Sequence, residues 1–406
     1  MINSERLLER FLRYIAVDTQ SDPDNYTETP STGKQFDLAK MLKSEMDEMG
    51  IETWLDEEHC YVYGHLKGDG AKRTVGFVAH IDTAPDLDGK CVNPIIHDYE
   101  GGDIRLNDDY VISAEVFPEM ENYKGQKIIT TDGTTLLGAD DKAGVAAIME
   151  LLATLTDHPE LPHGDIAVCF TPDEEIGHGA EYLDLDRFGA DFAYTVDGGE
   201  IGGMEYETFN AASAKIDIGG RNVHPGSAKG KMINAALIGI ELQNMLPVAQ
   251  RPEYTENHEG FFLLTDIEGT VEQCSMSYII RDHDREKFEE KKQLIADAVK
   301  FLEEKHHIKI KLEVKDSYYN MSEIIEKDMS IVELACDAMK AIGVEPAITP
   351  VRGGTDGAQL SFRGLPCPNL FTGGHNYHGR YEFLPIPSLN KATELLLQIA
   401  RQLTEE

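Results

Sequence analysis

Apolar positions along the first half of the chain alternate between strand-like runs and helical spacing. Leu7, Leu8, Phe11, Leu12 and Ile15 recur at the spacing of one helix face, which predicts an opening helix. Further on, we predict helices over 36–49 and 143–155 and short buried strands over 74–79, 166–170 and 192–196. This alternation is typical of an α/β domain with a mostly parallel central sheet flanked by helices.

The pattern changes near residue 211. Residues 213–218 and 308–314 alternate as half-exposed strands, and 275–280 is a further strand. Helical spacing covers 233–246 and 284–304. The alternation of helices and strands then resumes, with a helix over 331–342, a strand over 369–372 and a helix over 388–403. We therefore predict one α/β domain made of residues 1–209 and 317–406, interrupted by a smaller α+β lid, residues 210–316.

Composition narrows the class of protein. The chain has 406 residues, with 37 basic and 73 acidic side chains and a net charge of −36. The electrostatic field of this negative charge repels nucleic acid and anionic membranes. No run approaches the roughly 18 apolar residues of a membrane helix, and the first residues lack a signal-peptide layout. The six cysteines include no CxxC pair, which argues against a disulfide framework or a thiolate metal site. We expect a cytoplasmic protein.

Acidic and histidine side chains follow the strand-like runs of the α/β part. They are His80 and Asp82 after the first strand, Asp140 and Asp141 after Leu136-Leu137-Gly138, Asp173, Glu174 and Glu175 after 166–170, Asp197 after 192–196, and His375 and His378 after 369–372. Ligands bind at the carboxyl ends of strands in such sheets, where loops from distant parts of the chain meet. A solvated turn is the plain alternative for 173–175, but five such positions together favour a site.

Imidazole and carboxylate groups without thiolates suit Zn²⁺ or a similar divalent ion. Two histidines with several carboxylates suffice for two ions that share one carboxylate, as in two-metal hydrolytic sites. Of Glu174 and Glu175, one would bind metal and the other would move protons, since neighbours in an extended segment point in different directions. Asp82 lies two residues after His80, on the same side of an extended chain, where it can accept from the second ring nitrogen of His80.

Several longer stretches carry a family resemblance. They are GFVAHIDTAPD, TLLGADDKAGVAAIM, TPDEEIGHGA, YTVDGGEIG, NAASAKI with NVHPGSAKG, RGGTDGAQLS, and NLFTGGHNYHG. Together they resemble the dizinc peptidase family M20, and within it the bacterial tripeptide aminopeptidases. The likeness runs nearly end to end, lid included.

The resemblance implies a role for each matching residue. His80 and Asp197 would bind one zinc ion, Glu175 and His378 the other, and Asp140 would bridge both. Glu174 would be the general base, and Asp82 would support His80. Cobalt or manganese are candidate substitutes for the two zinc ions. The resemblance also implies a cis peptide bond between Asp140 and Asp141.

Three further residues are candidates for substrate binding. Arg281 and Arg352 could each hold the substrate's terminal carboxylate, because a guanidinium presents a fork that fits it; an ordinary ion pair is the alternative. His224 resembles the lid histidine that stabilises the oxyanion, which a neighbouring subunit supplies in dimeric members, so the resemblance also allows a homodimer. His375 has no assigned role, and we expect it either behind the ligands or exposed to solvent rather than as a third histidine ligand.

From these expectations we predict a metal-dependent aminopeptidase. It would remove the N-terminal residue of tripeptides held between the catalytic domain and the lid. A dizinc dipeptidase or an N-acyl amino-acid amidohydrolase would use the same chemistry. A non-catalytic peptide-binding protein on the same scaffold is the alternative from another class.

Overall fold

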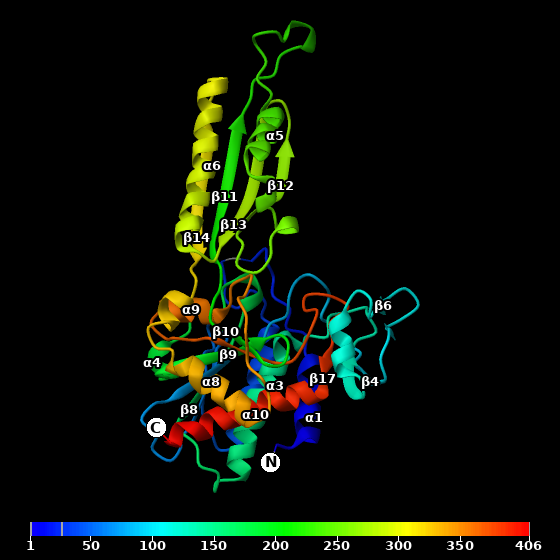
Figure 1. Ribbon diagram of the computed structural model, residues 1–406, viewed down its shortest axis with the longest axis vertical. Coiled ribbons are helices and arrows are strands. Elements are labelled where there is room, and N and C mark those ends of the chain that lie inside the picture. Colours follow the sequence, from blue (N-terminus) through cyan, green and yellow to red (C-terminus); the bar gives the residue numbers. More distant parts are fainter. Residues whose placement is uncertain (1, 26, 406) are drawn as a thin grey trace. The chain divides into compact units, whose positions relative to one another are not determined.

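The computed structural model describes residues 2–25 and 27–405 and divides into two units (Figure 1). Unit 1 comprises Met1–Tyr206, Glu323–Thr349 and Thr355–Glu406. Unit 2 comprises Glu207–Ser322 and Pro350–Gly354. Unit 2 therefore includes residues 210–316, together with a few flanking residues and one loop from much later in the chain.

An eight-stranded sheet in the order β1-β2-β8-β3-β9-β16-β10-β15 forms the centre of unit 1. Its strands are β1 (Glu52–Leu55), β2 (Val62–Leu66), β3 (Val75–His80), β8 (Ile166–Thr171), β9 (Phe192–Gly198), β10 (Gly203–Glu205), β15 (Ala347–Ile348) and β16 (Asn369–Phe371). The four neighbouring strands β8, β3, β9 and β16 are parallel. Their carboxyl ends consequently lie along one edge, and the fold class predicted from the sequence is confirmed.

Helices flank this sheet. Unit 1 contains α1 (Ser4–Ile15), α2 (Gln35–Glu48), α3 (Ala139–Asp157), α4 (Leu185–Phe188), α8 (Ser330–Ala341), α9 (Asp356–Phe362) and α10 (Ile386–Gln402), while α7 (Ser322–Ile325) includes the last residue of unit 2 before the chain returns to unit 1. Helix α3 packs against β3 and β9, with α1 and α10 against α3. Phe188 of α4 and Leu360 of α9 join strand residues such as Cys169 in a separate buried cluster.

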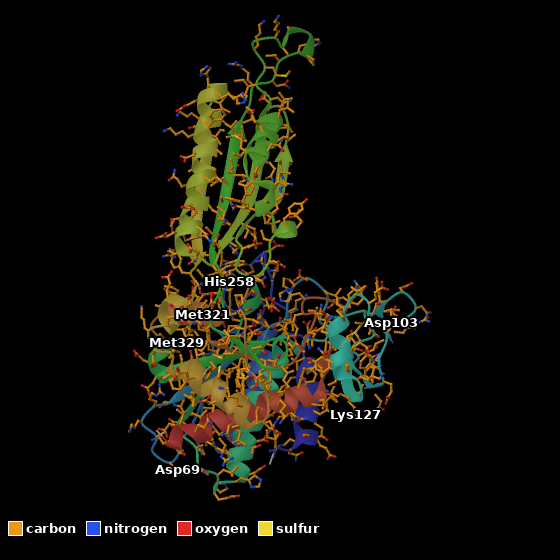
Figure 2. The ribbon with its side chains drawn as sticks, in the orientation of Figure 1. Asp69, Asp103, Lys127, His258, Met321 and Met329 are labelled. Atoms are coloured by element: carbon orange, nitrogen blue, oxygen red, sulfur yellow. The ribbon has the colours of Figure 1, made fainter. Side chains whose placement is uncertain are left out.

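Part of unit 1 has no counterpart in the sequence prediction. A three-stranded sheet combines β4 (Ile95–Tyr99), β7 (Gln126–Thr130) and β17 (Leu384–Pro385), and a two-stranded sheet combines β5 (Ile104–Arg105) and β6 (Val111–Ile112). These two small sheets form a separate lobe of unit 1, in which Asp103 and Lys127 lie (Figure 2). Its own core includes Met120 and Tyr123 of the 3₁₀ helix η1 (Pro118–Tyr123) and Phe383.

The start of α3 corrects one detail of the sequence analysis. Asp140 does not directly follow a strand, contrary to the prediction, since β7 ends at Thr130 and belongs to the smaller sheet. Gly138 adopts a left-handed conformation (φ +76°), and α3 begins at Ala139. The expected cis peptide bond is present between Asp140 and Asp141.

Unit 2 is an antiparallel four-stranded sheet in the order β12-β13-β11-β14, covered by two helices. Its elements are β11 (Asn210–Gly219), α5 (Ala235–Met245), β12 (Phe261–Gly269), β13 (Gln273–Asp282), α6 (Arg285–His306) and β14 (Ile310–Tyr318). Alternate residues of β13, and of β11 from Ala212 onward, are buried, and they form one core with α5 and α6. Among the described residues of the whole chain, no helix has the length and apolar character required to cross a membrane.

Candidate metal centre

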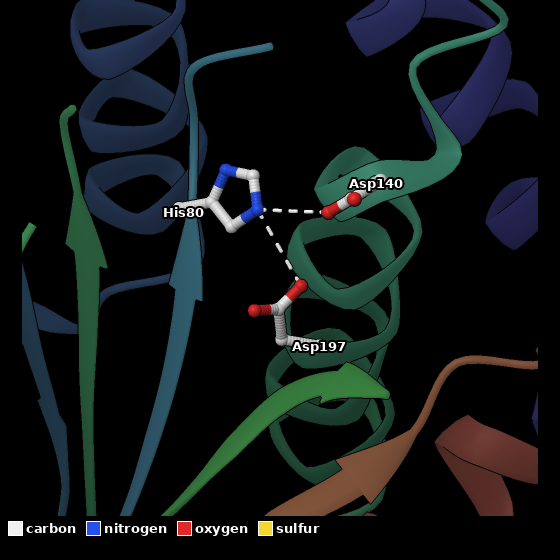
Figure 3. Close-up of side chains that lie close together, drawn as sticks. All are labelled: His80, Asp140 and Asp197. Carbon is white, nitrogen blue, oxygen red and sulfur yellow. Dashed lines mark hydrogen bonds and ion pairs between the residues drawn. The ribbon is translucent and has the colours of Figure 1, made fainter. Parts of the chain in front are cut away.

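The carboxyl-end edge of the large sheet holds a first group of potential metal ligands. His80 is the last residue of β3, Asp197 lies near the end of β9, and Asp140 lies at the start of α3. His80 Nε2 lies 2.9 Å from Asp140 Oδ1 and 3.4 Å from Asp197 Oδ1. Figure 3 shows the imidazole directed at both carboxylates. The three residues each offer one ligand atom within a sphere small enough for a single ion.

A second group shares Asp140 with the first. His378 Nε2 lies 3.3 Å from Asp140 Oδ2 and 3.0 Å from Glu175 Oε2. Each oxygen of Asp140 thus faces a different histidine, which is the arrangement expected of a carboxylate that bridges two ions. All five residues are candidates predicted from the sequence, and in the structure they lie together at one place.

The donor chemistry fits divalent cations. Both groups consist of imidazole nitrogens and carboxylate oxygens, the set that Zn²⁺ and similar ions accept. Buried Glu175 Oε1 has no hydrogen-bond partner among the described residues, a costly state that a cation would relieve. Burial, together with the charge of Asp140, raises the pKa of the Glu175 and Asp197 carboxyls to about 7. Positive charge between the groups would remove this repulsion.

Asp82 contacts both His80 and the backbone of Glu174 and Glu175. Its Oδ1 lies 3.3 Å from His80 Nδ1, and its carbonyl oxygen lies 3.1 Å from the same nitrogen. The Asp82 carboxylate also accepts the backbone N–H groups of Glu174 (3.1 Å) and Glu175 (3.2 Å). One buried carboxylate therefore contacts His80 and fixes the backbone of the Glu174-Glu175 pair, a second function that the sequence did not predict.

The Glu174-Glu175 pair is not extended, which corrects the reason given for their different directions. Glu174–Ile176 form a 3₁₀ turn, η2. Asp173 enters this turn with a left-handed backbone (φ +54°), and its carboxylate accepts the Ser31 hydroxyl (2.6 Å) and Gln35 Nε2 (2.6 Å). Burial raises the pKa of the Glu174 carboxyl well above its usual range.

Two supporting residues received no role from the sequence. Asp141 Oδ2 accepts the backbone N–H of His80 (3.2 Å), and Oδ1 accepts that of Gly144 (3.1 Å). Asn369 Oδ1 accepts the backbone N–H of Asp197 (3.1 Å), while its Nδ2 donates to Glu205 (2.7 Å). Asp141 had a visible signal, because it is the second acid of the Asp-Asp pair. Asn369 had none, because nothing in the sequence links it to Asp197.

His375 lies at the base of the loop that carries His378, where its backbone pairs with that of Phe383. Its Nε2 is 2.7 Å from the Tyr123 hydroxyl, and its ring stacks on Phe383 with centroids 4.6 Å apart. Burial lowers the pKa of His375 to about 4. It is absent from both ligand groups found among the described residues, so its contacts are with the lobe rather than with the ligands.

The three candidate substrate-binding residues all belong to unit 2. His224 is exposed, and its Nδ1 accepts the backbone N–H of Gly226 at 3.1 Å. Arg281 is partly buried in β13, donates to the carbonyl of Ile280 (3.1 Å) and lies over the Tyr318 ring. Burial lowers the pKa of the Arg281 guanidinium.

Arg352 is more heavily engaged within its own unit. Its Nη1 donates to the carbonyls of Asn257 (2.7 Å) and Glu259 (2.9 Å), and its Nη2 donates to the Thr255 hydroxyl (2.9 Å). The guanidinium also lies over the rings of Phe209 and Phe261. These bonds hold the loop 255–259, and they leave Arg352 fewer donors for a ligand than Arg281.

Comparison with known proteins places this geometry in a family. The profile of Peptidase family M20/M25/M40 matches residues 122–402. The chain is 54% identical over 403 residues to a protein named Peptidase T of Alkaliphilus oremlandii (strain OhILAs), covering 97% of this chain and 98% of that one.

Two solved structures share the fold. The aminopeptidase PepT of Bacillus cereus ATCC 10987 aligns with a TM-score of 0.79 at 25% identity, covering 99% of each chain. A tripeptidase of Staphylococcus aureus subsp. aureus Mu50 aligns with a TM-score of 0.81 at 23% identity, covering 100% of each chain, and shows the fold alone. The segment that the family profile matches contains four of the five ligand candidates, all except His80. The likeness to Peptidase T covers nearly the full length of the chain. The chain belongs to peptidase family M20/M25/M40.

Proposed function

We propose that this chain is a dizinc aminopeptidase that releases the N-terminal residue of tripeptides. The observation that carries the proposal is the position of Asp140, with one carboxylate oxygen directed at each of two ligand groups. Similar proteins named Peptidase T and aminopeptidase PepT support peptide substrates and removal of the N-terminal residue.

The proposed metal ligands are His80 and Asp197 for one ion, Glu175 and His378 for the other, and Asp140 for both. Zinc suits this donor set, with cobalt or manganese as substitutes. The chemistry that such a pair supplies is polarisation of the scissile carbonyl and a lowered pKa of water.

Glu174 is the proposed general base. Its backbone is fixed by Asp82, and its carboxylate is adjacent to a proposed ligand without belonging to either ligand group. In this assignment, Glu174 takes a proton from the attacking water and delivers it to the leaving amine. Asp82 holds His80 and the turn of Glu174 together, so that base and ligand keep their spacing during turnover.

Substrate recognition is assigned to unit 2. Arg281 is favoured over Arg352 for the peptide's terminal carboxylate, because its Nη1 donates to the carbonyls of Ala212 and Ile280, whereas both Nη1 and Nη2 of Arg352 donate within the protein. His224 keeps Nε2 available as a donor, since Nδ1 already accepts from Gly226, which suits stabilisation of an oxyanion. The net charge of −36 supports a cytoplasmic enzyme that acts on small peptides rather than on nucleic acid or anionic membranes.

A substrate comparison tests the proposal. The zinc-loaded enzyme should release the first residue of an unblocked tripeptide faster than that of the matching dipeptide, and it should leave the N-acetylated tripeptide intact. Preferred cleavage of dipeptides or N-acyl amino acids would identify a dipeptidase or an amidohydrolase instead. Peptide binding without any cleavage would identify a peptide-binding protein.

A further inference from the structure

One buried carboxylate holds the turn that carries Asp140. Glu382 is 2% exposed. Its Oε2 accepts the backbone N–H groups of Leu137 (2.8 Å) and Gly138 (2.9 Å), and its Oε1 accepts those of Ala139 (2.7 Å) and Asp140 (3.2 Å). An ionised carboxylate has about four acceptor positions, so this turn satisfies Glu382 completely.

The turn needs such an acceptor because its backbone is irregular. Gly138 is left-handed, and Asp140 has non-helical angles (φ −84°, ψ +104°) although it lies inside the first turn of α3. The N–H groups at a helix start have no partner within the helix, and they favour negative charge. Three buried donors and one partly buried donor without an acceptor would be costly, so the carboxylate fixes the backbone conformation from which the Asp140 side chain projects.

The same loop of the chain provides both Glu382 and His378. His375 and Phe383 exchange backbone hydrogen bonds, N–H to carbonyl, at 2.9 and 3.1 Å. These bonds close a loop over residues 376–382, with His378 inside it and Glu382 at its end. The Tyr123 hydroxyl holds the base of this loop through His375. The backbone of the shared ligand and the loop of the second histidine are thereby tied directly to each other.

We propose that Glu382 is a positioning residue that sets the place of Asp140 relative to His80 and His378, and through it the affinity of the metal pair. Glu382 contacts no reacting atom in this scheme. The inference rests on the proposed metal centre. A purely stabilising cap at the start of α3 is the alternative, and it predicts lower stability with unchanged metal binding.

Glu382→Gln is the test variant, because the amide nitrogen that replaces one oxygen cannot accept a backbone N–H. Glu150→Gln is a matched control, because Glu150 is a buried carboxylate within α3, the helix whose start Glu382 contacts. Glu150 is fully buried and binds Arg6 and Arg10 of α1, each at 2.7 Å. Its loss should weaken the packing of α1 on α3 without touching the turn that carries Asp140.

The measurements are zinc affinity, by competition with a chromophoric chelator, and the melting temperature of the metal-free protein. Both variants should melt below wild type. Only Glu382→Gln should bind zinc more weakly, by tenfold or more for at least one ion, as expected when a residue that orients a ligand is lost. Glu382→Asp keeps both acceptor oxygens and should recover part of the affinity.

Zinc affinity of Glu382→Gln equal to that of Glu150→Gln would overturn the inference and leave Glu382 as a cap. If Glu382→Gln does not fold, Glu382→Asp carries the same comparison, because its shorter side chain cannot reach all four N–H groups. Failure of the wild-type protein to bind two zinc ions would instead contradict the proposed function, so the two failures are distinguishable.

Discussion

Asp82 accepts a hydrogen bond from the backbone N–H of Glu174, with 3.1 Å between the nitrogen and Oδ1. The same carboxylate lies beside His80. A residue two positions after the end of β3 therefore contacts one proposed ligand and holds the turn that presents the proposed base.

Asp82→Asn should impair turnover more than folding. The asparagine amide has one acceptor oxygen, so one of the two backbone N–H groups of the Glu174-Glu175 turn would face an NH₂ group instead. We expect kcat/KM for a tripeptide to fall about 10- to 100-fold, with the circular dichroism spectrum retained. Asp98→Asn, at an exposed partner of Lys127, is the control, and equal activity of the two variants would contradict this role.

Arg281→Ala should raise KM for tripeptides that end in a free carboxylate. A charge-assisted bond to that carboxylate is worth enough to change KM by about tenfold to a hundredfold. KM for the C-terminally amidated tripeptide should change little, since it offers no carboxylate. Steady-state kinetics on both substrates make the comparison, and a similar increase for both would show that Arg281 does not bind the carboxylate.

Arg352→Ala should act mainly on stability. Its guanidinium supports the loop 255–259 through carbonyls that would lose their donor. We expect the free energy of unfolding to fall by about 1–3 kcal/mol, and protease cleavage in the loop to become faster. Retained stability with a large, carboxylate-specific rise in KM would reverse the assignment of the two arginines.

Much of this site could be predicted because its ligands follow apolar runs that form parallel strands. His80 and Asp197 come at the ends of β3 and β9, where ligands gather in such sheets. The small lobe could not be predicted from the sequence, because strands such as β5 and β6 have two residues each. Such short strands show no alternation of apolar and polar residues. Asn369 and Glu382 act across 172 and more than 240 residues of sequence. Glu382 left one trace, a charged residue within the apolar run Tyr381-Glu-Phe-Leu384.

Glu205 should make stability depend on pH. Burial raises the pKa of its carboxyl from 4.5 to about 7, against a hydrogen bond from Asn369 that lowers it. The folded state therefore binds this proton more tightly than the unfolded state does. The associated stability is present below pH 4.5 and is lost as the pH rises to about 7, a cost of about 3 kcal/mol at most.

Glu205→Gln removes that cost and keeps an acceptor for Asn369. Its melting temperature should exceed that of wild type by a few degrees at pH 8, with the difference shrinking towards pH 5. Calorimetry at both pH values measures this, with the exposed Glu57→Gln as control. A difference that is constant with pH would show that Glu205 titrates normally in the folded protein.

The central claim is a two-metal site in which Glu174 is the base, and one comparison tests it most directly. Bound zinc and tripeptide cleavage are measured for metal-stripped protein, zinc-reloaded protein and zinc-reloaded Glu174→Gln. We predict two zinc ions per chain in both reloaded proteins, cleavage restored only in wild type, and kcat lower by about 10²- to 10⁴-fold in the variant. A reloaded Glu174→Gln that cleaves at the wild-type rate, or a wild-type chain that holds two zinc ions and leaves tripeptides intact, would contradict the account.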